Sequence, residues 1–174
     1  ITGIYDCPYL MRCSPSELQW LRDYAVETND IWSGELGINQ STAITCVKPS
    51  GTVSQLASCS SGIHPSYNRY FIRRVRNDKK DPLAQVMIDS GIPYEEDKSN
   101  QEAWVFSFPM SANGKTRKEV GPIQQLEMWK KFALNWCEHK PSMTCYVPEN
   151  MWPQVGAWVW ENFETLNGIS FLPS

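Results

Sequence analysis

Short β-branched and aromatic runs alternate with longer helical patterns along this chain, and that alternation constrains the fold more than any other feature. The strand-like runs lie at 42–48, 70–76, 103–108, 143–147 and 168–172. The helical patterns lie at 15–35, 82–90, 122–139 and 149–163. Such alternation favours an α/β architecture with mixed helices and largely parallel strands, because a helix supplies the long crossover that a parallel pair needs.

Local signals mark several of these elements. Ser14-Pro15-Ser16-Glu17 is a capping box with proline at the first helical position, and Asp81-Pro82 begins a helix that Gly91 ends. In the 122–139 helix, apolar residues recur at spacings of three and four, which predicts one buried face. The members of this stripe are Ile123, Leu126, Trp129, Phe132, Ala133 and Trp136. Glu95–Lys98 is interpreted as a solvated turn without chemistry.

Length and charge limit the domain count and the partners. A chain of 174 residues fits one domain with a real core, and 16 basic against 19 acidic residues leave a net charge of −3. That balance argues against nucleic acid or a membrane surface as the main partner. The chain opens on Ile1 rather than Met and ends on an apolar run. We therefore expect 1–174 to be a single partial domain, truncated at both ends.

The cysteines are spread along the chain. They are Cys7, Cys13, Cys46, Cys59, Cys137 and Cys145. None forms a C-x-x-C motif and only two histidines accompany them, so no metal site is predicted. The spacing, without a secretion signal, fits free, buried thiols in a reducing cytoplasm.

The segment 42–54 joins a predicted strand to a tight turn. Ile44 and Val47 are β-branched and apolar, which predicts a buried strand, and Pro49 cannot continue a strand ladder. A short helical segment, 53–57, is expected to follow the turn.

The turn itself suits an anion. Gly51 allows a close backbone approach, and Ser50, Thr52 and Ser54 place hydroxyls where a helix would begin. Free N–H groups at such a start favour a bound phosphate. The alternative is an ordinary Pro-Ser-Gly turn in which Ser50 or Thr52 caps the helix.

Two neighbouring features allow a functional and a structural interpretation. His64 is either a ligand contact or a structural histidine whose ring nitrogens are satisfied within the fold. A basic cluster follows, and it provides either salt-bridge partners or a phosphate contact. Its members are Arg73, Arg74, Arg76, Lys79 and Lys80.

These segments together resemble the adenosylcobalamin-dependent (class II) ribonucleotide reductases, most closely the ribonucleoside-triphosphate reductase branch. The similar segments occur in the family's order and cover nearly the whole chain from about Leu36. They are 44–56, 61–65, 70–76, 78–83, 106–109, 136–142, 155–159 and 168–173. The resemblance implies the later part of a ten-stranded α/β barrel.

The resemblance also implies a chemistry. A member of this family reduces the ribose 2′ carbon of a ribonucleotide, here expected to be a triphosphate, with the diphosphate as the alternative. Adenosylcobalamin initiates a protein thiyl radical, and a thiol reductant such as thioredoxin restores the enzyme. A radical made locally by cobalamin also agrees with the absence of tyrosine from 168–173, where iron-dependent relatives carry a pair.

The resemblance assigns a role to only a few residues. Ser50, Gly51, Thr52, Val53 and Ser54 match the family's substrate-phosphate loop, and His64 matches a segment near the substrate. No Asn-x-Cys-x-Glu pattern occurs, so no catalytic residue is assigned and the chain alone is predicted to be inactive.

Two other interpretations stay open. The chain is then either a stand-alone nucleotide- or phosphate-binding module without catalysis, or a barrel fragment that folds but binds nothing. An isolated piece of the barrel exposes strand edges that the whole barrel would pair, which predicts self-association.

Overall fold

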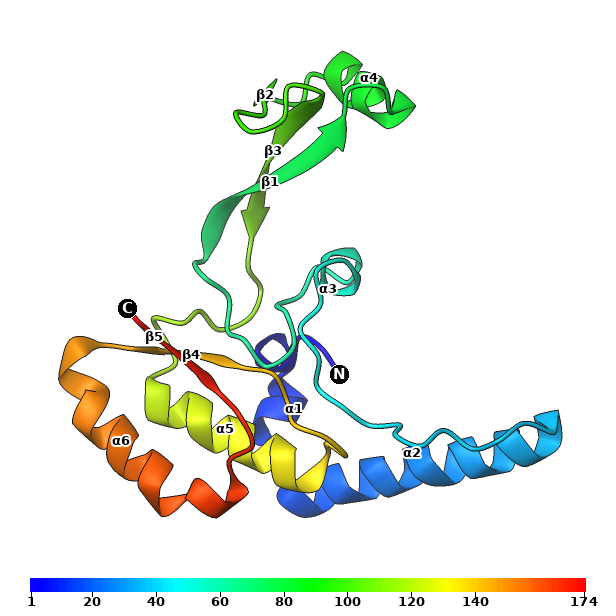
Figure 1. The fold of residues 1–174 in the computed structure, drawn as a ribbon, viewed down its shortest axis with the longest axis vertical. Helices are drawn as coiled ribbons and strands as arrows, with labels where there is room; N and C mark the ends of the chain where they lie inside the picture. The colour runs from blue at the N-terminus through cyan, green and yellow to red at the C-terminus, as the bar shows by residue number, and fades with distance from the viewer. The chain divides into compact units, whose positions relative to one another are not determined.

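The chain divides into two compact units. The computed structural model describes all residues, 1–174, and unit 1 comprises Ile1–Tyr67 and Asn113–Ser174, while unit 2 comprises Asn68–Ala112. Figure 1 shows the elements of both units in chain order. Whether the two units belong to one partial domain stays a prediction.

The N-terminal part of unit 1 is helical. A 3-10 turn, η1 (Ile4–Asp6), and the short α1 (Pro8–Arg12) precede the long α2 (Pro15–Leu36). The predicted capping box is confirmed, since the Glu17 amide donates to the Ser14 hydroxyl and the Ser14 amide donates to the Glu17 carboxylate. Gly37 ends α2 in the left-handed region, at φ 65°.

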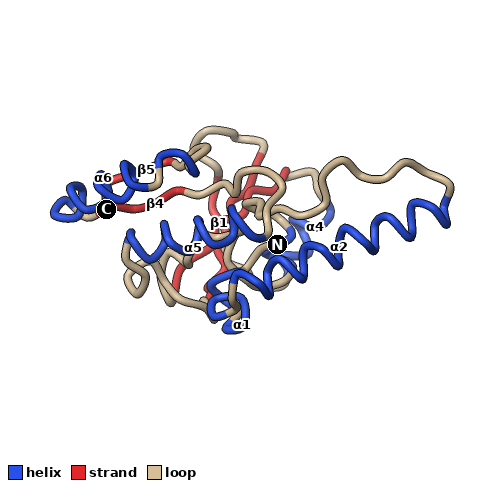
Figure 2. The backbone as a smooth tube through the Cα atoms, turned by 90° about the horizontal axis from the view of Figure 1, so that it is seen from below, coloured by secondary structure: helices blue, strands red, loops and turns tan.

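The later part of unit 1 packs helices against a parallel strand pair. α5 (Pro122–Asn135) lies beside α2, and α6 (Trp152–Glu161) also packs on α5 (Figure 2). The strands β4 (Thr144–Val147) and β5 (Ser170–Pro173) run parallel, with Tyr146 opposite Leu172. Two 3-10 turns, η2 (Glu149–Met151) and η3 (Phe163–Thr165), flank α6.

The core of unit 1 follows the predicted apolar stripe. Leu126, Trp129 and Phe132 of α5 are completely buried, and the indole N–H of Trp129 donates to the Pro141 carbonyl at 2.9 Å. Side chains from α2, β4 and α6 complete this core, which explains why these elements fold together. They include Leu18, Cys145, Val147, Val155 and Trp158.

Unit 2 is an antiparallel sheet with one helix. β1 (Tyr70–Asp78) pairs with β3 (Ala103–Ser111) along its whole length, and β2 (Tyr94–Glu96) pairs with the other edge of β3. α4 (Pro82–Asp89) lies in the connection after β1. The expectation of largely parallel strands is therefore wrong for this unit, although it is correct for β4 and β5. The connection returns the chain alongside β1 in the opposite direction, so no parallel crossover forms.

Two further expectations need correction. Residues 42–48 form no strand, because their backbone groups bond side chains and the chain's N-terminus instead of a neighbouring strand. The segment 95–98 is not simply a solvated turn. Glu95 and Glu96 belong to β2, and Asp97 is buried. Its Oδ1 accepts hydrogen bonds from the Ser99 amide and hydroxyl, and Arg76 forms an ion pair with its Oδ2.

Candidate phosphate-binding loop

Three consecutive backbone N–H groups of the predicted loop are open to solvent. Gly51, Thr52 and Val53 are exposed, and no group of the chain accepts a hydrogen bond from their amides. α3 (Val53–Leu56) begins within this stretch. Adjacent unpaired amides form a concentrated source of positive potential, which is the arrangement that oxyanions bind.

The two outer serines hold the loop in shape. The Ser54 amide donates to the Ser50 hydroxyl at 2.8 Å, and the Ser54 hydroxyl donates to the Ser50 carbonyl at 2.7 Å. The Ser50 amide in turn donates to the Ser61 hydroxyl at 2.7 Å. Ser54 is completely buried. The five predicted residues thus have two different roles. Gly51, Thr52 and Val53 have the unbonded amides, and Ser50 and Ser54 form the hydrogen bonds that fix the shape of the loop.

The need for glycine differs between the two glycines of this region. A Cβ placed on Gly51 meets no atom within 4 Å, so only an approaching ligand would require its absence. Gly62 has φ 59°, and a Cβ there would lie 2.9 Å from the Lys48 carbonyl oxygen. Gly62 therefore allows the segment after the loop to pack closely against Lys48, which precedes the loop. Sequence analysis missed this role.

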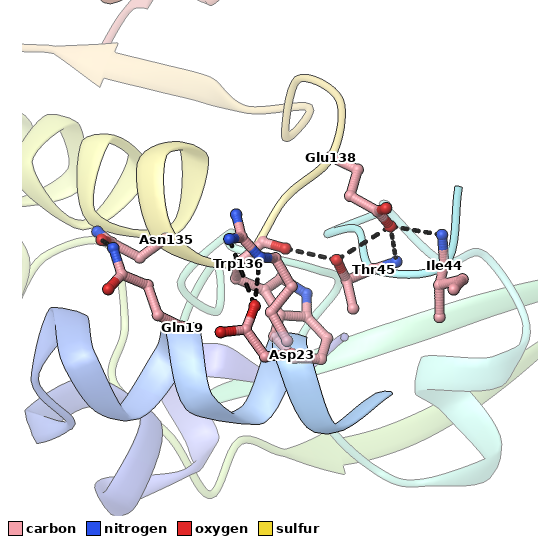
Figure 3. Close-up of polar contacts among 8 residues, drawn as sticks. Gln19, Asp23, Ile44, Thr45, Asn135, Trp136 and Glu138 are labelled. Carbon is pink, nitrogen blue, oxygen red and sulfur yellow. Dashed lines mark hydrogen bonds and ion pairs between the residues drawn. The ribbon is translucent and has the colours of Figure 1, made fainter. Parts of the chain in front are cut away.

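Glu138 clamps the segment that leads into the loop (Figure 3). One carboxylate oxygen accepts from the amides of Ile44 at 2.5 Å and Thr45 at 2.6 Å, and from the Thr45 hydroxyl at 3.2 Å. The Thr45 hydroxyl also lies 2.6 Å from the Trp136 carbonyl, to which it can donate. These bonds, from Thr45 first and then Ile44, lower the pKa of Glu138.

Hydrogen bonds also hold the C-terminal end of α5, close to Glu138, in place. The Trp136 indole N–H donates to the Cys46 carbonyl at 3.0 Å, and Gln19 of α2 donates to Asn135 of α5 at 2.9 Å. Sequence analysis did not assign Glu138, because its partners lie more than 90 residues away. The segment 136–142, which belongs to the family resemblance, was the available signal.

His64 has a structural environment. Its Nδ1 lies 2.9 Å from the Ser61 carbonyl, and its Nε2 accepts the Thr144 amide at 3.0 Å. The ring is therefore neutral, with the proton on Nδ1 facing the carbonyl. Both nitrogens are in use, so His64 joins the loop to β4, and its proximity to substrate stays a prediction.

Two of the thiols, those of Cys137 and Cys145, lack the features of a reactive site. All six cysteines are free, as predicted, and burial raises the pKa of Cys137 and of Cys145 to about 11. No group of three His, Cys, Asp or Glu side chains is arranged to hold a metal ion. None of the helices combines the length and the apolar character that crossing a bilayer requires.

Comparison with known proteins identifies relatives. No protein-family model matches the chain. The adenosylcobalamin-dependent ribonucleoside-triphosphate reductase of Levilactobacillus brevis is 27% identical over 95% of the chain, and that of Lactobacillus acidophilus is 30% identical over 86%. The chain spans 23% and 21% of the length of these two proteins.

A solved structure agrees with these relatives. The crystal structure of a B12-dependent (class II) ribonucleotide reductase superposes on 92% of the chain with a TM-score of 0.77 and 27% identity, and the chain covers 23% of it. The α/β fold of a class II ribonucleotide reductase segment is thereby confirmed. In sequence the chain is similar to the adenosylcobalamin-dependent ribonucleoside-triphosphate reductases, as the sequence resemblance predicts.

Proposed function

We propose that this chain is the substrate-phosphate-binding portion of a ribonucleotide reductase that converts ribonucleoside triphosphates to deoxyribonucleotides. The homologues support the enzyme class. The open amides of Gly51, Thr52 and Val53 are the observation that carries the assignment of the loop. They give the terminal anion of a nucleotide three adjacent donors on a prebuilt backbone.

The contribution of this chain is binding and orientation. Ser50, Ser54 and Ser61 fix the loop, and Glu138 fixes the segment before it, so little ordering is left for the ligand to induce. Burial raises the pKa of Cys137 and Cys145 to about 11, so these two thiols do not supply a nucleophile at neutral pH. Because no Asn-x-Cys-x-Glu pattern occurs in the chain, the thiyl radical and the reducing cysteines of the proposed reaction are assigned to other parts of the enzyme, and this chain alone is expected to be inactive.

Adenosylcobalamin is the cofactor of the proposed enzyme, and it would supply the initiating radical. His64, Cys137 and Cys145 are not free to ligate its cobalt. Both nitrogens of His64 are engaged, and Cys137 and Cys145 are buried. A thiol reductant such as thioredoxin, a cytoplasmic location and self-association of the chain belong to the same proposal.

The loop assignment is tested by titrating the isotopically labelled chain with ATP and following backbone amide resonances. We expect the Gly51, Thr52 and Val53 amides to shift together. Gly51→Val should weaken the apparent affinity about tenfold, comparable with losing one charge-assisted hydrogen bond. The fold should be unchanged, because nothing lies within 4 Å of a Cβ at this position.

Gly34→Val in α2 is the matched control, since a Cβ there also meets nothing within 4 Å. It should bind ATP like the unaltered chain. Equal affinity of both variants, or silent amides at 51–53 with millimolar ATP, would count against the loop. A stand-alone binding module is favoured instead if the chain binds ATP but fails to support reduction when joined to the remaining parts of a homologous reductase.

A further inference from the structure

The guanidinium of Arg117 lies over two aromatic rings in unit 1. Its guanidinium carbon lies 3.7 Å from the centre of the Tyr67 ring and 4.5 Å from the centre of the Tyr146 ring. The cation therefore lies over two aromatic rings, and its attraction to both rings restrains the guanidinium. Such an arginine loses little further freedom when its edge binds a ligand.

The edge of this guanidinium has no partner within the chain. No carboxylate or carbonyl accepts a hydrogen bond from its N–H groups. Glu119, the acidic residue nearest in sequence, instead accepts from the Thr116 amide at 2.8 Å and the Thr116 hydroxyl at 2.7 Å. A rigid cation without a counter-charge, whose donors form a fork, matches the geometry of an oxyanion.

The backbone beneath Arg117 is tied down as well. The Arg117 amide donates to the Ser66 carbonyl at 2.9 Å, and the Ser66 amide donates to the Lys115 carbonyl at 3.0 Å. These two bonds hold the segments that carry Tyr67 and Arg117 side by side. The site is therefore built from three parts of the chain, namely 66–67, 115–117 and β4.

The position on the sheet also favours a ligand. Cys145 and Val147 are buried in the core, so Tyr146 between them points to the opposite face of the β4–β5 pair. Tyr146 is the penultimate residue of β4. Open α/β sheets bind ligands beyond the carboxyl ends of their parallel strands.

We propose that Arg117 binds the phosphate group of a nucleotide whose base stacks on the exposed side of Tyr67. Tyr67 is 65% exposed although Arg117 covers one face of its ring, so the remaining surface is available to a planar base. This site uses different residues from the 50–54 loop and does not depend on phosphate binding there.

The test is a titration of the labelled 174-residue chain with three probes, namely inorganic phosphate, adenosine and AMP. The side-chain Nε–H resonance of Arg117 should shift with phosphate and with AMP. The Tyr67 ring resonances should shift with adenosine and with AMP. AMP, which satisfies both contacts, should bind at least tenfold more tightly than either of the other two probes.

Variants identify the residues responsible. Arg117→Gln should weaken AMP binding about tenfold, and Arg117→Lys should weaken it less, because a lysine keeps the charge but not the fork. Lys118→Gln removes the same charge from the exposed neighbouring residue and should change the affinity less than twofold. If Arg117→Gln does not fold, the proposal is tested by whether the Arg117 Nε–H resonance of the unaltered chain shifts with AMP.

Equal weakening by Arg117→Gln and Lys118→Gln would show non-specific attraction and overturn the proposal. An Arg117 resonance that stays still at saturating AMP would do the same. Because the 51–53 amides are observed in the same spectra, failure at Arg117 is distinguishable from failure of the phosphate-binding loop.

Discussion

The two units of the chain are stabilised in different ways. Unit 1 has a continuous apolar core, which includes the fully buried Leu126, Trp129 and Phe132. Unit 2 buries one large side chain completely, Phe106, and otherwise depends on the antiparallel β1–β3 ladder. Proposed binding residues occur only in unit 1, where a rigid core can hold loops in fixed positions.

Unit 2, which has a small apolar core, also contains several ion pairs. Arg74 contacts Glu95, and Arg76 contacts the buried Asp97. Lys79 contacts Glu96 at 2.9 Å and also lies over the Trp104 ring. Arg74, Arg76, Lys79 and Lys80 are therefore salt-bridge partners, which was one of the two sequence interpretations of the basic cluster. Arg73, its other member, lies over the Phe71 ring. Exposed pairs of this kind contribute little each, so unit 2 is expected to open more readily than unit 1.

Removing the central aromatic side chain of unit 1 tests this contrast most strongly. Trp129→Ala should lower the free energy of unfolding by about 3–5 kcal/mol, because it creates a cavity and leaves the Pro141 carbonyl unbonded. Chemical denaturation followed by circular dichroism measures the change. Trp160→Ala, at a side chain that is 84% exposed, should change stability by less than about 0.5 kcal/mol. Similar losses in both variants would contradict the proposed core.

The Glu138 clamp gives an intermediate effect confined to unit 1. Glu138→Ala should cost about 1 kcal/mol, because the amides of Ile44 and Thr45 lose an accepting carboxylate that is largely solvated. Hydrogen exchange at 44–54 should increase more than exchange in α5. Glu138→Gln keeps an accepting oxygen and should restore most of the protection. Uniformly faster exchange across the unit would show a general loss of stability instead.

The smallest expected effect lies in unit 2 and appears only in acid. Hydrogen bonds from Ser99 and the nearby Arg76 lower the pKa of Asp97 from its usual 3.8 to about 2. Because the folded-state pKa is the lower one, the carboxylate stabilises the fold above pH 4, and this contribution is lost as the pH falls towards 2. Exchange at β1 and β3 amides should therefore rise over that interval, and Asp97→Asn should remove the dependence.

Glu102→Gln is the control for the acid titration, since Glu102 is exposed and its contact with Lys80 is long, at 3.7 Å. This variant should keep the pH dependence of the unaltered chain. If it removes the dependence as fully as Asp97→Asn does, general charge rather than the Asp97 site is responsible.

The sequence predicted elements best where the determinants are local. The capping box at Ser14, the proline starts of α4 and α5, and the apolar stripe around Trp129 were all recognisable within one or two helical turns. The prediction of a strand at 42–48 was wrong because a strand also needs a neighbouring strand to pair with, and the local sequence pattern does not show whether one is present. The burial of Asp97 was not predicted because Glu95 and Glu96 beside it are acidic, whereas its partner Arg76 belongs to β1, far away in the sequence.

The candidate site shows the same limit. The assignment of residues 50–54 to phosphate binding stays a prediction. The sequence did not show that the Ser50 amide is bonded to Ser61, or that Glu138 holds the preceding segment in place. Arg117 gave no signal at all, because Tyr67 and Tyr146 meet it only after folding.

The clamp at the end of α5 also has an evolutionary consequence. The Thr45 hydroxyl contacts both the Trp136 carbonyl and the Glu138 carboxylate. These two acceptors lie two positions apart, just after the last residue of α5. An inserted or deleted residue between Trp136 and Glu138 would move one of these two acceptors away from Thr45 and displace the proposed phosphate-binding loop. Homologous chains should therefore keep a constant spacing here.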